Sequence, residues 1–234
     1  MLTQGIDFND KGIVLVSDTI REGLGCEVSS LMGANVANEV AKDEFCEATI
    51  GSHNKQHGQV FQKLFDTPNF KVNVVEDSNG VELCGALKNI VALGAGFVDG
   101  LEYGGNTKAA IIRIGLAEMK AFCHRFFSGI KDETFLESCG IADLITTCYG
   151  GRNRKCAEAF AKTGKGWETL EQELLNGQKL QGTLACEEVY KIIKANKAEK
   201  DFPLFTTIHR VAFEGLPPKE LFNGLSGEDN QEQR

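Results

Sequence analysis

The hydrophobic pattern of this chain changes near residue 77, and the change limits the folds available to it. Before that point, apolar runs at residues 28–32, 48–51 and 70–75 resemble short β-strands, and the apolar residues within 53–65 fall at helical spacing. From residue 80 to 222 the apolar residues follow helical spacing, and no convincing strand is found. We therefore expect an α+β chain, with a short α/β region at residues 1–76 and a larger all-α domain at residues 77–234.

The segment that precedes these runs has two interpretations. Ile13, Val16, Ile20 and Leu24 share one helical stripe, and Gly25 stands where a C-terminal cap belongs. Residues 13–16 could instead form a strand, because all four are apolar and two are β-branched valines. The pattern favours a helix and leaves the strand open.

The composition is that of a globular protein. The chain has 234 residues, 42% hydrophobic and 25% charged, and its 33 acidic against 25 basic residues give a formal net charge of −8. This balance argues against nonspecific binding to nucleic acid. Lys88 and Asn89 interrupt the longest apolar stretch, residues 81–98, and the N-terminal residues do not resemble a secretory signal. We expect a soluble, cytoplasmic protein without a membrane span.

The cysteines and histidines predict neither a disulfide framework nor a metal site. The closest of the eight cysteines, Cys148 and Cys156, lie eight residues apart, so no CxxC pair occurs. Reduced thiols in a cytosolic setting fit this usage better than disulfides. His53 and His57 have the spacing of two metal ligands, but neither a third ligand nor a general-base glutamate accompanies them, and we expect no bound metal.

Residues 84–96 contain the first candidate for chemistry. On a helix, Lys88 shares a face with the apolar Cys84 and Val91, whereas Asn89 lies among small residues. Burial disfavours the charged form of a lysine, so a lysine in such surroundings can exchange a proton near neutral pH. The alternative is that the stem of Lys88 packs while its ammonium reaches water.

Residues 143–155 contain the second candidate. Asp143 and Thr147 are four residues apart, so a helix would present a carboxylate and a hydroxyl side by side. Two glycines then let the chain turn and bring Arg152 and Asn153 to a helix start, where free amides and a guanidinium can bind a phosphate or carboxylate. The alternative is a solvated basic helix start with Asn153 as an ordinary N-cap.

Two glycine-containing segments carry weaker signals. The polar loop at residues 176–182 joins two helical patterns and could hold binding residues, although most such loops only connect. Residues 94–100 read GxGxxxG rather than GxGxxG and end an apolar helical pattern. We expect these last glycines to serve packing and capping.

The stretches 31–37, 84–92, 106–110, 137–155 and 175–182 together resemble the eukaryotic-type cytosolic NAD-dependent glycerol-3-phosphate dehydrogenases. The similarity runs from about residue 1 to 222, and the stretch from Glu137 is its most specific part. The resemblance implies an oxidoreductase of glycerol-3-phosphate and carbohydrate metabolism. Such an enzyme interconverts dihydroxyacetone phosphate and sn-glycerol 3-phosphate by hydride transfer with NAD, as a cytoplasmic homodimer.

The resemblance also assigns roles to polar residues around the proton transfer. Lys88 resembles the general acid/base that protonates the ketone oxygen as hydride reaches the carbonyl carbon, and it also contacts the substrate. Asn89, Asp143 and Thr147 resemble the residues that orient this lysine and the substrate hydroxyls.

Further positions match binding residues of the family. Arg152 and Asn153 resemble the substrate phosphate site. The positions that match contacts to NAD are Ala37, Arg152, Lys179 and Gln181.

Two departures from the family pattern bear on activity. The family begins with a Rossmann half that carries a strand, a GxGxxG loop and a helix, and this sequence holds no such segment, a shortfall of roughly 100 residues. The chain therefore resembles the C-terminal remnant of a Rossmann-type α/β domain followed by an all-α substrate and dimerisation domain. In addition, Gln4 stands where the family has a lysine that helps to hold substrate.

These departures leave other hypotheses open. The chain could be a noncatalytic truncated isoform or fragment that acts as a dimer partner, because it lacks the GxGxxG loop. It could also be an incomplete version of an ordinary, longer enzyme. In either case, strand edges without neighbours would favour self-association.

Overall fold

The computed structural model describes residues 6–9 and 12–225, which divide into two compact units. The first unit comprises Met1–Lys88 with Met119–Thr146, and the second comprises Asn89–Glu118 with Thr147–Arg234. Three helices contribute residues to both units, so the predicted boundary between residues 76 and 77 stays a prediction. Gln4 lies outside the described residues.

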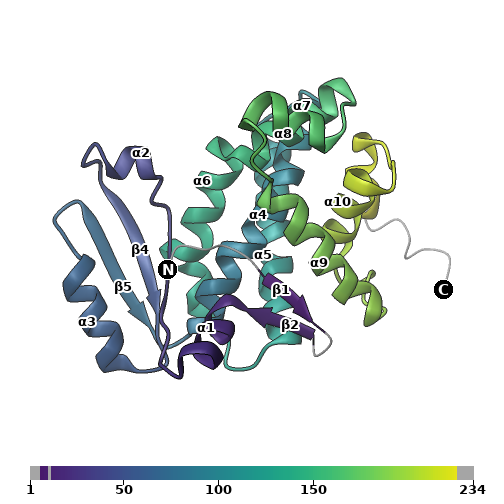
Figure 1. The fold of residues 1–234 in the computed structure, drawn as a ribbon. Coiled ribbons are helices and arrows are strands. Elements are labelled where there is room, and N and C mark those ends of the chain that lie inside the picture. The colour runs from purple at the N-terminus through teal and green to yellow at the C-terminus, as the bar shows by residue number, and fades with distance from the viewer. Residues whose placement is uncertain (1–5, 10–11, 226–234) are drawn as a thin grey trace. The chain divides into compact units, whose positions relative to one another are not determined.

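The first unit contains two small sheets (Figure 1). Strands β1 (Ile6–Asn9) and β2 (Gly12–Leu15) form an antiparallel pair. Strand β3 (Ser30–Met32) pairs antiparallel with β4 (Cys46–Gly51), and β4 pairs parallel with β5 (Phe70–Val75). The strands predicted at residues 48–51 and 70–75 are thus confirmed, and β3 lies within the run at 28–32. The sequence did not predict β1.

Three helices accompany these sheets: α1 (Val16–Leu24), α2 (Ala37–Val40) and α3 (Lys55–Phe65). The two interpretations of residues 13–24 each hold in part, because β2 ends at Leu15 and α1 begins at the next residue. As predicted, Gly25 caps α1, in the left-handed conformation at φ 64°. Asn54 caps α3 by accepting hydrogen bonds from two backbone amides of its first turn.

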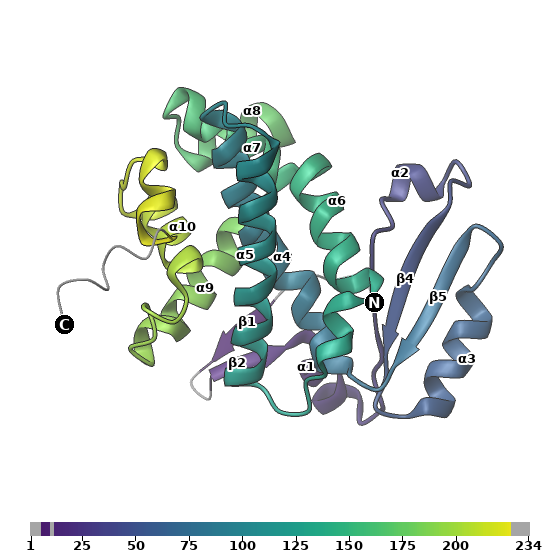
Figure 2. The ribbon, with the colours of Figure 1, turned by 180° about the vertical axis from the view of Figure 1, so that it is seen from behind.

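The rest of the chain is helical. After Val75, the described residues contain no strand, which confirms the predicted change of character. The elements in chain order are α4 (Ser78–Gly100), α5 (Gly105–Phe126), η1 (Asp132–Leu136), η2 (Ser138–Ala142), α6 (Asp143–Gly150), α7 (Arg152–Thr163), α8 (Trp167–Leu175), α9 (Gln181–Ala195), α10 (Pro203–Phe213) and η3 (Pro218–Leu225). Within the second unit, α7 lies beside α8 and α9 beside α10 (Figure 2).

Helix α4 is the most deeply buried element. Its length and composition would allow it to cross a membrane, but its whole apolar window is buried inside the protein, as in the core helix of a globular domain. Small residues let neighbours approach it closely, because a Cβ at Gly85 would lie 2.8 Å from the Met32 sulfur. Lys88 and Asn89 interrupt this apolar helix near its middle, where a polar group needs a partner.

Candidate functional site

Lys88 and Asp143 form a buried ion pair within the first unit. The Lys88 Nζ donates to the Asp143 Oδ2 at 2.5 Å, and the two residues are only 5% and 4% exposed. Lys88 comes from the middle of α4, and Asp143 is the first residue of α6. The structure therefore buries the ammonium beside a carboxylate, and the alternative in which it reaches water is wrong.

Two thiols lie one helical turn before this pair. Cys84 and Cys139, each four residues before its charged neighbour, are fully buried. A hydrogen bond to Cys139, together with burial, raises the pKa of the Cys84 thiol well above its usual range. Cys84 thus stays protonated and neutral, and it packs as a small apolar group.

Contacts with strand β4 fix the start of α6. The Ser138 hydroxyl donates to the Glu47 carbonyl at 2.7 Å, and the Cys139 amide donates to the Thr49 hydroxyl at 3.1 Å. Ser138 and Cys139 belong to η2, a single π-helical turn of the kind that often occurs at functional sites. The sheet of the first unit therefore holds the turn that leads into Asp143.

Asn89, the residue after Lys88 on α4, takes part in a hydrogen-bond chain within the second unit. The Asn153 side-chain amide donates to the Asn89 Oδ1 at 2.9 Å, and the Gly182 amide donates to the Asn153 Oδ1 at 2.9 Å. A Cβ at Gly182 would lie 2.8 Å from both Asn153 Oδ1 and the Asn89 carbonyl oxygen. The chain thus joins α4, α7 and the first turn of α9, and position 182 requires glycine.

The start of α7 differs from the alternative in which Asn153 caps it. The N-cap is Gly151, which offers no side chain, and Asn153 is the second helical residue, buried in the chain just described. Reading Asn153 as an N-cap is therefore wrong. Arg152, the first helical residue, is exposed and donates to the Gln178 side-chain oxygen at 2.6 Å. The helix start and Arg152 together offer donors to an anion, as the sequence suggests.

The loop at residues 176–182 is tied to α8 by a buried carboxylate. Glu171 accepts a hydrogen bond from the Lys179 ammonium at 2.9 Å and another from the Leu180 amide at 3.0 Å. Burial alone would raise the pKa of Glu171, but these two donors outweigh it and hold the pKa below its usual value. The Lys179 ammonium is consequently held in an ion pair with Glu171. Gln181, two residues later, is the first residue of α9.

Thr147 lies on α6, four residues after Asp143, as the spacing predicts. It is half-buried, and its carbonyl oxygen would lie 2.6 Å from a Cβ at Gly151. The turn between α6 and α7 therefore passes directly over the last turn of α6, which explains the glycine there.

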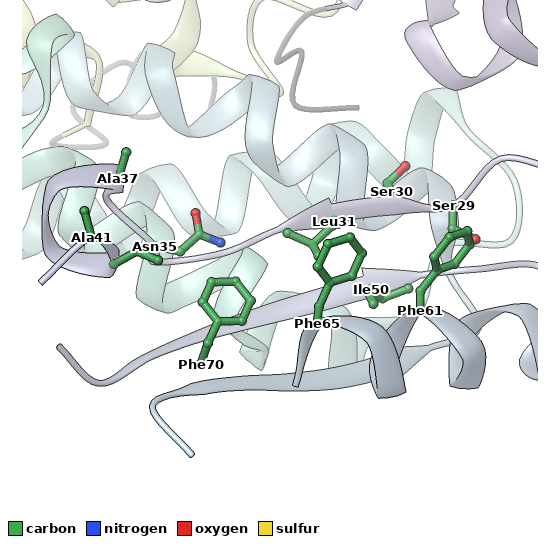
Figure 3. Close-up of a pocket in the computed structure, with 11 residues that line it drawn as sticks. Ser29, Ser30, Leu31, Asn35, Ala37, Ala41, Ile50, Phe61, Phe65 and Phe70 are labelled. Carbon is green, nitrogen blue, oxygen red and sulfur yellow. The ribbon is translucent and has the colours of Figure 1, made fainter. Parts of the chain in front are cut away.

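Ala37, a predicted cofactor contact, begins α2 and lines a pocket of about 680 Å³ in the first unit. Figure 3 shows Ala37 and Ala41 at one end of this pocket and Ser29 at the other, with aromatic rings from α3 and β5 beside it. The walls are mainly apolar, with the amide of Asn35 and two serine hydroxyls as polar groups. Its volume and mainly apolar lining lie within the range of small-molecule pockets.

Metal-ligating side chains do not cluster in the part of the chain that the structure describes. No group of three or more His, Cys, Asp or Glu side chains there could hold an ion. All eight cysteines lie within the described residues and form no disulfide there, and only Cys26 is exposed.

Sequence reasoning missed the residues that hold the predicted ones. Glu171, Gln178 and Gly182 each bind a candidate residue, yet none has a pattern of its own. The loop at 176–182 was a signal, because a polar, glycine-containing loop between helices supplied two of these three residues. Glu171 gave no such signal, since it lies in an ordinary charged helix.

The chain is similar to a known family over most of its length. Residues 1–58 match the family model described as NAD-dependent glycerol-3-phosphate dehydrogenase N-terminus, and residues 77–223 match that of the C-terminus. A glycerol-3-phosphate dehydrogenase 1-like protein of Xenopus tropicalis is 58% identical over 96% of this chain and 64% of its own length. The cytoplasmic NAD(+) glycerol-3-phosphate dehydrogenase of Bos taurus is 57% identical over the same shares.

Solved structures agree. The glycerol-3-phosphate dehydrogenase of Plasmodium falciparum superposes with a TM-score of 0.92 at 44% identity, over 96% of this chain and 63% of the other. That of Saccharomyces cerevisiae gives a TM-score of 0.90 at 42% identity, over 95% and 66%. The chain spans about 64% of the length of the curated relatives named above.

The likeness covers both the short mixed sheet with its helices and the helical region, so the predicted fold, a partial Rossmann-type region followed by a mostly helical domain, is confirmed. Two family models together match most of the sequence, and the candidate residues lie within the matched ranges. This chain belongs to the eukaryotic NAD-dependent glycerol-3-phosphate dehydrogenase family.

Proposed function

We propose that this chain carries out the proton-transfer and phosphate-binding steps of an NAD-dependent glycerol-3-phosphate dehydrogenase, interconverting dihydroxyacetone phosphate and sn-glycerol 3-phosphate. The observation that carries the proposal is the buried Lys88–Asp143 pair. A lysine residue only 5% exposed, with its ammonium 2.5 Å from a carboxylate, is costly to bury, and such buried charged groups cluster at functional sites. Family membership supports proton transfer to a ketone as the role of this pair.

Lys88 is the general acid/base. In reduction, its ammonium donates a proton to the carbonyl oxygen of dihydroxyacetone phosphate as hydride arrives at the carbonyl carbon. In oxidation, the neutral amine takes the hydroxyl proton. Asp143 keeps the ammonium oriented and stabilises its charge. The Cys84 thiol on the preceding turn of α4 is neutral, so it does not compete with Asp143 for the ammonium.

Arg152 and Asn153 bind the substrate phosphate. The guanidinium of Arg152 and the free amides at the start of α7 supply donors to a dianion. Asn89 and Thr147 orient the substrate hydroxyls, and the hydrogen bond from Asn153 to Asn89 sets the orientation of the Asn89 amide. Binding and orientation are thereby assigned to different side chains.

NAD supplies or accepts the hydride when it is bound. The residues that would hold it are Ala37, Arg152, Lys179 and Gln181. The pocket beside Ala37 supports this assignment in the first unit, and the cations Arg152 and Lys179 support it in the second. We further propose that the protein works in the cytoplasm as a homodimer, as the curated name of the bovine relative suggests for its location.

The test is NADH oxidation with dihydroxyacetone phosphate as substrate. We expect Lys88→Ala to lower kcat by roughly 10²- to 10⁴-fold, the usual contribution of general acid/base catalysis. Lys88→Met keeps the length of the side chain, and circular dichroism of both variants checks that they fold. Lys120→Ala, which removes an exposed lysine paired with Asp132, is the matched control and should turn over normally. Equal turnover by wild type and Lys88→Ala would contradict the role of Lys88.

A fluorescence titration with NADH separates this proposal from the noncatalytic alternative. Saturable binding is expected of an enzyme and contradicts a chain that serves only as a dimer partner. A chain that neither binds NADH nor turns over substrate would support that alternative.

A further inference from the structure

The first turn of α7 carries charges that oppose its own stability. Arg152, Arg154 and Lys155 are all basic, the turn has no acidic residue, and its N-cap glycine offers no side chain. The N-terminus of a helix has a partial positive charge, so cations there are unfavourable. No side chain of the N-cap residue accepts a hydrogen bond from the first amides of the helix. The negative charge that compensates this turn therefore has to come from residues outside it.

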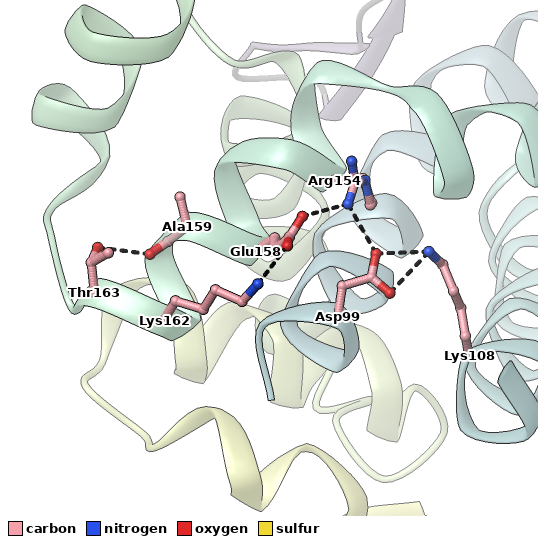
Figure 4. Close-up of polar contacts among 7 residues, drawn as sticks. All are labelled: Asp99, Lys108, Arg154, Glu158, Ala159, Lys162 and Thr163. Atoms are coloured by element: carbon pink, nitrogen blue, oxygen red, sulfur yellow. Dashed lines mark hydrogen bonds and ion pairs between the residues drawn. The ribbon is translucent and has the colours of Figure 1, made fainter. Parts of the chain in front are cut away.

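Asp99 supplies the missing negative charge from α4. The Arg154 Nη1 donates to the Asp99 Oδ2 at 3.1 Å and to the Glu158 Oε2 at 2.5 Å, as Figure 4 shows. Asp99 also accepts from the Lys108 Nζ at 2.7 and 3.0 Å, and Lys108 lies in the first turn of α5, which has no acidic residue either. Asp99 thus pairs with one basic residue at each of two helix starts.

The placement of Asp99 is itself unusual. It is the penultimate residue of α4, where the negative end of the helix disfavours a carboxylate, and the last turn of α4 holds no basic residue. Its two cationic partners offset that cost. An acid at a helix end and bases at two helix starts are each unfavourable alone and favourable together.

Close packing then transmits the position of Asp99 to the backbone of α7. A Cβ at Gly96 would lie 2.3 Å from the Arg154 carbonyl oxygen, and one at Gly100 would lie 2.7 Å from that of Glu158. The two glycines flank Asp99 on α4, so the ion pair sits where the helices touch. The register between α4 and α7 is consequently fixed at the turn that contains Arg154.

We propose that Asp99 is a positioning residue for substrate phosphate. By holding Arg154 it fixes the first turn of α7, and so places Arg152 and Asn153. Asp99 does not touch the substrate in this role, which rests on the proposed function of Arg152 and Asn153. The Asn153 bonds to Asn89 and Gly182 hold the same turn from its other side, so a shift of α7 would strain them.

If only the charge of Asp99 mattered, its removal would have the opposite effect on phosphate binding, so the proposal can be tested. Asp99→Asn removes a negative charge beside two cations in the unit that binds phosphate. If Asp99 acted only through its field, this variant would attract a dianion more strongly. If it positions α7, the variant should bind phosphate more weakly.

The experiment compares wild type, Asp99→Asn, Asp99→Glu and a matched control, Asp132→Asn. Asp132 also accepts from two basic side chains, Lys120 and His124, but belongs to the first unit. Amide hydrogen exchange at residues 151–156 reports on the turn without any need for activity. An NMR titration with inorganic phosphate and with glycerol 3-phosphate reports on binding, and steady-state kinetics separate KM from kcat.

We expect Asp99→Asn to speed exchange at residues 151–156 and to weaken binding of both phosphates, each by roughly five- to tenfold, a change of the size that the loss of one ordinary hydrogen bond produces. KM for dihydroxyacetone phosphate should rise more than kcat falls. Asp99→Glu, which keeps the charge, should restore part of the binding, and Asp132→Asn should match wild type. If Asp99→Asn fails to fold, the same comparison with Asp99→Glu decides, because a longer side chain with unchanged charge should still speed exchange.

Unchanged exchange in the Asp99 variants, or tighter phosphate binding by Asp99→Asn, would overturn the positioning role. Failure of the proposed function looks different, because wild type would then neither bind phosphate nor turn over substrate.

Discussion

Helix α3 in the first unit and helix α7 in the second have similar lengths but opposite surroundings. Helix α3 exposes four large apolar side chains, Val60, Phe61, Leu64 and Phe65, and packs on β5 through Gly58, its only buried residue. Helix α7 buries Asn153 and pairs Arg154 with Asp99 of α4 and with its own Glu158. One helix has apolar surface without cover, and the other has polar groups that are paired.

This difference shows that the sheet region of the first unit and the contacts of α7 in the second unit depend on different interactions. The β3–β5 sheet has a small apolar cluster, in which Ala48, Ile50 and Val72 are buried, and an open pocket lies beside it. The second unit closes around glycine contacts and hydrogen-bonded polar groups, which tolerate little displacement. Substitutions should therefore be costly at the helix contacts of the second unit and mild on α3.

The largest expected effect is at Gly96. Gly96→Val should lower the free energy of unfolding by about 4 kcal/mol or more, because its Cβ would overlap the backbone of α7. Gly23→Val is the matched control: a Cβ at Gly23 of α1 meets nothing within 4 Å, so the change should be within about 0.5 kcal/mol. Urea denaturation measures both. Equal losses at the two glycines would show that the second unit is no more tightly constrained than α1.

The next effect is a pH dependence at Glu118. This buried carboxylate of α5 accepts from the Leu204 and Phe205 amides at 2.7 and 2.9 Å, and so caps α10. Burial raises its pKa to about 7, although these amides act in the opposite direction. The folded state therefore binds this proton more tightly than the unfolded state, whose value is near 4.5.

Stability from this group is fully present below pH 4.5 and is lost as pH rises to 7 and beyond. We expect the difference in free energy of unfolding between wild type and Glu118→Gln to change by on the order of 3 kcal/mol across that window. The wild type loses stability relative to Glu118→Gln as the pH rises. Urea denaturation at several pH values measures it. A difference that stays constant with pH would show that Glu118 does not titrate there.

The smallest effect on stability is expected on α3. Phe61→Gln and Phe65→Gln alter half-exposed rings that line the open pocket, so each should change the free energy of unfolding by less than about 1 kcal/mol. Both should reduce self-association in sedimentation equilibrium, because they remove uncovered apolar surface. Leu184→Gln, at a similarly exposed position of α9, is the control. If the Phe61 and Phe65 variants associate as the wild type does, the apolar surface at the pocket does not drive self-association.

Periodicity predicted the element types well where a segment was long or alternating. The strand at Phe70–Val75 and the helical region after it follow from spacing alone, and Gly25 was recognisable as a cap. The short β1 and α2 were missed, because four residues give too little periodicity to distinguish. The helical spacing at Phe61 and Phe65 predicted a helix, but spacing cannot show whether anything covers the apolar face.

Among the candidate residues, the apolar neighbours of Lys88 left burial and a solvated ammonium both open, and the resemblance named Asp143 among the residues that orient this lysine. No local pattern could pair the two, because Asp143 is 55 residues away and only the fold shows that it reaches the ammonium. The same holds for Asp99, whose place at the wrong end of a helix signals a partner without naming it.

The sequence by itself determined the change from α/β to helical character, the family and the residues that resemble its site, since these depend on local spacing and on residue identity. The tertiary structure alone decided that the Lys88 ammonium is buried and does not reach water, that Asn153 bonds to Asn89 and Gly182 rather than capping its helix, and that Asp99 bridges two helix starts. These contacts join residues far apart in the chain, and their geometry depends on close packing that no local pattern encodes.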